Sequence, residues 1–197
     1  MLGHLRSFLP WIAFAVLSTN GQYRYGALAG FLLAVGLVVV DRRAGRPWDA
    51  QIIELSSAVF FGALAVAAFA VRPAPLGDYG PAASVGWLAL TAWGSLAIRR
   101  PFTLGIARTM APPEAHGTPL FLRANAVVTG VWAAAFTVNA AVLALLLHLA
   151  PHATAALVVV KVCGFAVPAL VTARYARSTA RRAESALPTR PPQRARA

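Results

Sequence analysis

The chain of 197 residues is too apolar and too poorly charged to form a water-soluble surface. Apolar residues make up 58% of it and charged residues 12%, whereas soluble domains carry about 25% charged residues. Apolar runs alternate with short connectors that carry arginine, from one end of the chain to the other. This pattern is typical of a protein that crosses the membrane several times.

The net charge is +12, from 18 basic and six acidic residues. On a soluble fold, such an excess would indicate nucleic-acid binding. Here the arginines flank apolar runs, so they are better interpreted as a topology signal and as groups that attract anionic lipid headgroups. We therefore expect the lipid bilayer as a partner, with anionic lipids bound by the basic loops and tail, and no nucleic acid.

Six apolar segments predict an all-α bundle of six transmembrane helices within residues 1–175. The predicted spans are 5–18, 23–40, 50–71, 82–98, 121–149 and 154–175. The first is short for about 30 Å of hydrocarbon and resembles a secretory signal, but cleavage within it would leave too short an apolar region. Residues 176–197 are rich in arginine and proline and lack aromatic residues, which predicts a disordered basic tail.

The distribution of basic residues predicts the orientation. All but three of them lie near the amino terminus, in or beside the second and fourth connectors, or near the carboxyl end; the exceptions are Arg24, Arg72 and Lys161. Because cytoplasmic loops carry the excess of Lys and Arg, both termini are expected in the cytoplasm of an inner-membrane protein.

Two smaller patterns predict how segments pack. Gly26, Gly30 and Ala34 form a stripe of small residues that favours close packing within the chain, with a dimer interface as the alternative. In the fourth connector, Phe102 and Met110 lie on one face of a short amphipathic segment, with Ile106 between them. This segment is expected to lie in the headgroup plane, with Arg108 toward water.

Lys161 and Asn139 are the candidate binding residues. A lysine inside a span is costly and usually faces a partner or a cavity. Asn139 lies at a similar depth on the preceding antiparallel span, so the two residues are expected to share one polar site, for packing or for a ligand. Glu54 enters from the opposite side of the membrane, and it is expected to contact the cytoplasmic arginines rather than Lys161.

No pattern indicates catalysis, a metal site or a cofactor. His148 and His152 are four residues apart, but Pro151 separates them and a third ligand is lacking. Cys163 is the only cysteine, so the chain has no disulfide framework. Serine-elbow, phosphate-loop and zinc-protease motifs are missing from the sequence. The chain is therefore not expected to be an enzyme.

The second half of the chain carries a further pattern. Its elements are Arg100-Pro101, then Asn125, Trp132, Phe136 and Asn139 in one span, then Lys161 and Gly164 in the last. This arrangement resembles the bacterial intracellular septation protein A family, small multi-pass inner-membrane proteins associated with the cell envelope and division. The resemblance implies a structural or interaction role, with envelope proteins or a second copy as partners. The alternative is a small-solute transporter or channel that uses Lys161 and Asn139.

Overall fold

The computed structural model describes residues 6–18, 22–71, 76 and 79–185, without the side chains of residues 18, 49 and 179–185. Helices make up 86% of the structure, and the described residues contain no strand. The predicted all-α class is therefore confirmed.

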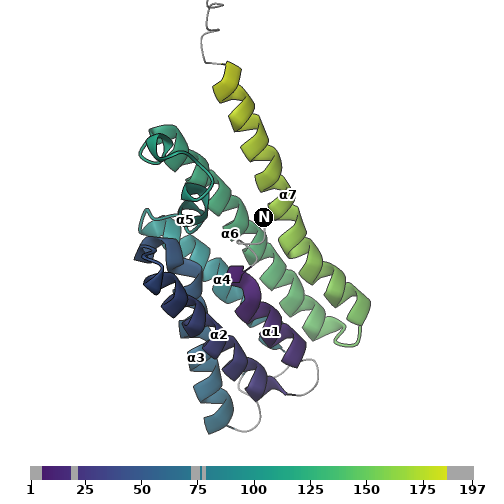
Figure 1. The fold of residues 1–197 in the computed structure, drawn as a ribbon. Helices are drawn as coiled ribbons and strands as arrows, with labels where there is room; N and C mark the ends of the chain where they lie inside the picture. The colour runs from purple at the N-terminus through teal and green to yellow at the C-terminus, as the bar shows by residue number, and fades with distance from the viewer. Residues whose placement is uncertain (1–5, 19–21, 72–75, 77–78, 186–197) are drawn as a thin grey trace, which may run out of the picture.

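The helices follow one another in the predicted order (Figure 1). Their bounds are η2 Arg6–Phe8, α1 Leu9–Ser18, α2 Tyr23–Arg43, η3 Trp48–Gln51, α3 Ile52–Ala70, α4 Gly80–Ala97, α5 Thr103–Arg108, η5 Pro113–Ala115, α6 Pro119–Leu149 and α7 Thr154–Ser185. Each apolar segment forms one continuous helix because it contains no internal proline, apart from Pro10 near the start of α1 and Pro168 in α7.

Four helices are long and apolar enough to cross a membrane: α2, α3, α6 and the part Thr154–Ser178 of α7. The helical bundle is thus confirmed, whereas the predicted count of six spans is not supported. Helix α1 has 10 residues, which gives only about 15 Å of rise. Helix α4 has 18 residues, but its glycine, serine and threonine residues dilute its apolar character.

The end of α7 corrects the predicted boundary of the tail. The last helix was expected to end at residue 175, but α7 continues to Ser185. Residues 176–185 are rich in alanine and arginine, which are strong helix formers, so the last apolar turns of the span are followed by more helix. The predicted disorder of residues 186–197 lies outside the described residues.

The stripe of small residues on α2 packs against α3. A Cβ atom on Gly30 would lie 2.8 Å from Cγ of Phe61, and one on Gly62 would lie 3.1 Å from the ring of Phe31. Each glycine therefore makes room for an aromatic ring of the other helix. The stripe therefore packs against another helix of the same chain, which agrees with the predicted packing within the chain.

The bundle has two chemically different ends. At the end that we call the basic end, Arg6 pairs with Asp41 and the hydroxyl of Thr103 donates to the backbone oxygen of Asn125, 3.1 Å away. At the opposite end, which we call the turn end, α6 turns into α7 and the hydroxyl of Tyr79 lies 3.3 Å from Nδ1 of His148. Figure 1 shows α5 and the carboxyl end of α7 away from the α6–α7 turn.

The connector that contains α5 packs against the bundle instead of presenting one apolar face to headgroups. A Cβ atom on Gly105 would lie 2.5 Å from Cα of Ala50, so α5 sits directly on η3. Phe102 is buried in the core, whereas Met110 is 74% exposed. Phe102 and Met110 therefore do not share the predicted apolar face. The reason is that α5 has only six residues, so one helix does not contain both ends of the segment.

Candidate functional site

Asp41 is the centre of a buried ionic contact at the basic end. It lies in the last turn of α2 with 1% of its surface exposed. Its carboxylate pairs with Arg6, and Nη1 of Arg46 lies 3.3 Å from its second oxygen. A buried carboxylate needs such partners because the unpaired charge would be costly to desolvate. The contact ties the amino-terminal segment and the α2–η3 connector to α2.

Two more buried polar residues lie beside this contact. Gln51 is fully buried, and its Nε2 donates to the backbone oxygen of Arg46 at 3.0 Å, while its Oε1 has no described partner. Glu54 is 4% exposed and accepts a hydrogen bond from the hydroxyl of Ser7 at 2.5 Å. Among the described residues, the partner of Glu54 is thus Ser7, and the prediction that Glu54 contacts the cytoplasmic arginines is wrong. The cause is η2, which brings Ser7 over the first turn of α3.

The surface of the basic end combines an aromatic ring with a cation. The guanidinium of Arg42 lies 4.1 Å from the ring centroid of Trp48, and Trp48 is 55% exposed. This is a cation–π geometry. Exposed Trp and Arg at one level suit the boundary between membrane and water, where aromatic rings and basic side chains gather.

The second candidate position is Asn139, in the middle of α6. Its side chain is 4% exposed, and neither its amide nitrogen nor its amide oxygen has a hydrogen-bond partner among the described residues. The amide lies against Gly164 of α7: a Cβ atom on Gly164 would be 1.9 Å from Nδ2 and 2.9 Å from Oδ1. Only glycine leaves this space open to the amide.

Pro168 leaves a backbone group unpaired at the same place. It lies inside α7 and is fully buried. Proline has no N–H, so the carbonyl four residues earlier, that of Gly164, loses its helical donor. The Gly164 carbonyl without its regular helical donor and the Asn139 amide without a described partner therefore belong to the same contact between α6 and α7. In a membrane such groups are expensive, and they usually mark either a repair of the helix or a ligand.

Lys161 lies one turn from this contact, with its side chain exposed. It makes no hydrogen bond or ion pair with another residue that the structure describes; both ion pairs found there involve Asp41. The structure therefore brings Asn139 close to the turn of α7 that carries Lys161, without a contact between the two side chains. Their shared site stays a prediction.

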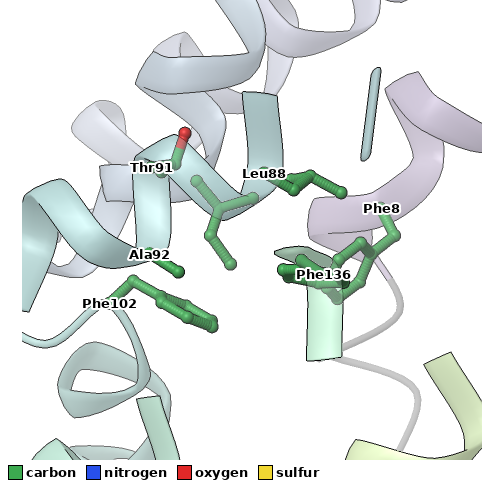
Figure 2. A pocket seen from close by; sticks show the side chains of 7 residues that line it. Phe8, Leu88, Thr91, Ala92, Phe102 and Phe136 are labelled. Carbon is green, nitrogen blue, oxygen red and sulfur yellow. The ribbon is translucent and has the colours of Figure 1, made fainter. Parts of the chain in front are cut away.

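A small cavity lies between the helices near the basic end, but it offers no polar group. It has a volume of about 10 Å³ and is lined by Phe8, Ile53, Leu88, Thr91, Ala92, Phe102 and Phe136. Figure 2 shows the apolar side chains around it. The Thr91 hydroxyl donates to the backbone oxygen of Trp87 at 2.9 Å. This space is at the lower limit for one water molecule and has too few polar partners to hold it.

The remaining predicted positions form no larger site. His148 contacts Tyr79, as described above, and among the described residues no three His, Cys, Asp or Glu side chains come together. Sequence reasoning missed Asp41, Gln51 and Pro168. Two signals were present in the sequence. Asp41 directly precedes Arg42 and Arg43 in a connector that also carries Arg46. Pro168 lies four residues after Gly164, which is the spacing of one helical hydrogen bond.

Comparisons of the chain with protein-family models, with curated proteins and with solved structures find no match.

Proposed function

We propose that the chain is an integral inner-membrane protein that acts as a structural or interaction component of the cell envelope and is not an enzyme. The observation that carries this proposal is the carboxyl end of α7. Figure 1 shows this end standing clear of the other helices at the basic end. Arg177 and Ser178 on it are exposed. An exposed helix that continues from a span is suited to contact another protein at the membrane surface.

The state of the buried polar groups supports a structural role. Asp41 is held by Arg6 and Arg46, and Glu54 by Ser7. These carboxylates join segments of the chain, and neither of them lines the cavity described above. The small apolar cavity offers no room for a substrate. A catalytic carboxylate would instead need to reach a bound molecule directly or through one water.

Exposed arginines at the basic end support insertion with this end in the cytoplasm. They include Arg42, Arg43, Arg46, Arg99 and Arg100. Each basic residue near an anionic membrane surface contributes about 1 kcal/mol of attraction. The same residues would hold both termini inside and anchor the bundle to anionic lipid.

The alternative is a small-solute transporter or channel. One observation favours it: Asn139 places an amide without a described hydrogen-bond partner against Gly164, one turn before Pro168 in α7. Buried polar groups inside membrane spans mark the pathways of solutes and ions. Liposomes that hold the purified protein would then show a solute flux that Asn139→Leu abolishes.

Site-specific photo-crosslinking in native membranes tests the interaction role. The photoreactive residue replaces Ser178 on α7 or, as the matched control, Thr109 after α5. Both are exposed residues near the basic end, and both hydroxyls donate to the backbone oxygen three residues earlier, at 2.8 and 2.7 Å. We expect envelope proteins to be captured from position 178 and not from position 109. Equal capture from the two positions, or none, would contradict the proposal.

A further inference from the structure

Lys161 is a charged residue on a surface that otherwise suits hydrocarbon. The nearest exposed side chains around it on α7 are apolar: Val158 is 52% exposed and Val162 is 59% exposed. Only 6% of the residues in the most apolar 18-residue window of this helix are buried. Acyl chains would cover the valines, but an ammonium group among them requires an anion.

The chain does not supply that anion within the part that the structure describes. Asp41 and Glu54 are buried at the basic end, where their partners are Arg6, Arg46 and Ser7. Lys161 lies seven residues after the start of α7, near the turn end. A second copy in the same orientation would place its Asp41 and Glu54 at the basic end as well, so these two carboxylates do not reach Lys161 through self-association either.

The depth of Lys161 points to the lipid headgroup. Seven residues correspond to about 10 Å along the helix axis from Thr154. A lysine has a flexible four-carbon stem, which can lie along the apolar surface while the ammonium group reaches toward the interface. The nearest anionic group that every phospholipid offers at that level is its phosphate.

We propose that Lys161 and the exposed valines beside it form a phospholipid-binding position at the turn end of α7. The ammonium binds the phosphate of a lipid in that leaflet, and the valines contact its acyl chains. This inference rests on the membrane insertion proposed above, and it adds a lipid contact on the leaflet opposite to the basic end. A lipid with net negative charge binds there more tightly than a zwitterionic one, because its headgroup lacks a competing cation.

Cys163 makes this proposal measurable. It is the only cysteine, it is exposed, and it lies two residues from Lys161. A fluorophore on Cys163 of the full chain, reconstituted in phosphatidylcholine vesicles, is quenched by neighbouring lipids whose acyl chains are brominated. We expect brominated phosphatidylglycerol to quench more than brominated phosphatidylcholine at equal mole fraction. One lysine near an anionic surface contributes about 1 kcal/mol, so the apparent affinity for phosphatidylglycerol should be about five times that for phosphatidylcholine.

Three variants decide the outcome. Lys161→Met removes the charge and should reduce the ratio to one, whereas Lys161→Arg should preserve it. Val159→Met places the same side chain two positions before Lys161, on the other side of the helix and outside the proposed position, where Val159 is 58% exposed, and it should leave the ratio unchanged. A ratio that survives in Lys161→Met would overturn the proposal. So would energetic coupling between Lys161→Met and Asn139→Leu, which would place the lysine inside the bundle.

The experiment also separates this inference from the proposed function. Quenching by both lipids in equal measure would reject the lipid position and leave insertion intact. A label that no brominated lipid quenches would reject insertion of this surface, and with it both proposals. Loss of the crosslinks from position 178, with the lipid preference retained, would contradict only the interaction role.

Discussion

The side-chain amide of Asn139 occupies the space in which a Cβ atom of Gly164 would lie, with 1.9 Å between that position and Nδ2. Helices α6 and α7 can therefore approach each other at this level only because residue 164 has no side chain. Two further contacts hold the same interface toward the basic end: Phe136 packs against Phe165 with ring centroids 5.4 Å apart, and Nε1 of Trp132 donates to the hydroxyl of Thr172 at 3.0 Å.

Gly164→Ala should destabilise the protein. The new methyl group would meet the Asn139 amide, and the two helices would have to separate or the amide would have to leave its site. Overpacking of this kind costs about 1 to 3 kcal/mol. Unfolding by denaturant in detergent micelles measures the change. Gly86→Ala is the matched control because its Cβ atom would lie 3.9 Å from that of Ala140, an ordinary contact.

In the control, the greater helix propensity of alanine should leave stability unchanged or raise it. Equal effects of the two substitutions would show that α6 and α7 do not pack as closely as described.

A double-mutant cycle between Asn139 and Pro168 tests whether the Asn139 amide interacts with the backbone of α7 next to Pro168. The Asn139 amide makes no hydrogen bond with a residue that the structure describes, and we expect that a rotation of this amide in the membrane brings its Nδ2 to the Gly164 carbonyl, which Pro168 leaves without its helical donor. Pro168→Ala supplies an N–H to that carbonyl, so Asn139→Leu should then cost less than it does in the natural sequence. Polar contacts between membrane helices set the expected coupling at about 0.6 kcal/mol, with an upper value of ~1.7 kcal/mol.

The same unfolding measurement yields the four stabilities of the cycle. Additive effects would mean that the Asn139 amide does not donate a hydrogen bond to the carbonyl that Pro168 leaves without its helical donor. In that case the unpaired groups of Asn139 would favour the ligand role of the transporter alternative.

Much of the fold is predictable because its signals are local. Apolar runs bounded by Arg, Pro and Gly define each helix to within a few residues, and matched depth places Asn139 beside the turn of α7 that carries Lys161. The end of α7 was predicted wrongly because the composition of the tail indicated disorder. The alanines and arginines of residues 176–185 favour helix, and a helix that has already formed in the span extends into them at little cost.

The candidate site is less predictable because it depends on contacts between distant segments. Ser7 reaches Glu54 across 47 positions of the sequence, and Arg6 reaches Asp41 across 35. Helix periodicity does not determine which end of one helix lies over which turn of another. The rotation of α6 about its axis, which directs Asn139 at Gly164 rather than at Lys161, is likewise determined by the packing of large side chains such as Phe136 and Leu143.

The orientation proposed for the bundle can be tested with reporters. A cytoplasm-active enzyme inserted at Gly45, in the connector between α2 and η3, should be active, as should one fused after Ala197. The physical reason is the excess of arginine at the basic end. A reporter inserted at Ala153, in the α6–α7 turn, should be active only outside the cytoplasm. Periplasmic activity at Gly45 would invert the orientation and place the basic end outside.

Asp41→Asn should loosen the amino-terminal segment from the bundle. The amide keeps the size of the carboxylate but removes the charge that pairs with Arg6 and Arg46. The side chains of these arginines are 32% and 46% exposed, so water can replace part of the lost interaction. We therefore expect a loss of about 1 to 3 kcal/mol, the range for a hydrogen-bonded group left without its partner.

Denaturant unfolding measures this loss, and proteolysis reports on the amino-terminal segment. Protease should cleave before α1 faster in Asp41→Asn than in the natural protein. Glu114→Gln is the matched control, since it neutralises an exposed acid in η5 and should change neither measurement. If Asp41→Asn and Glu114→Gln behave alike, the buried ionic contact does not hold the amino-terminal segment in place.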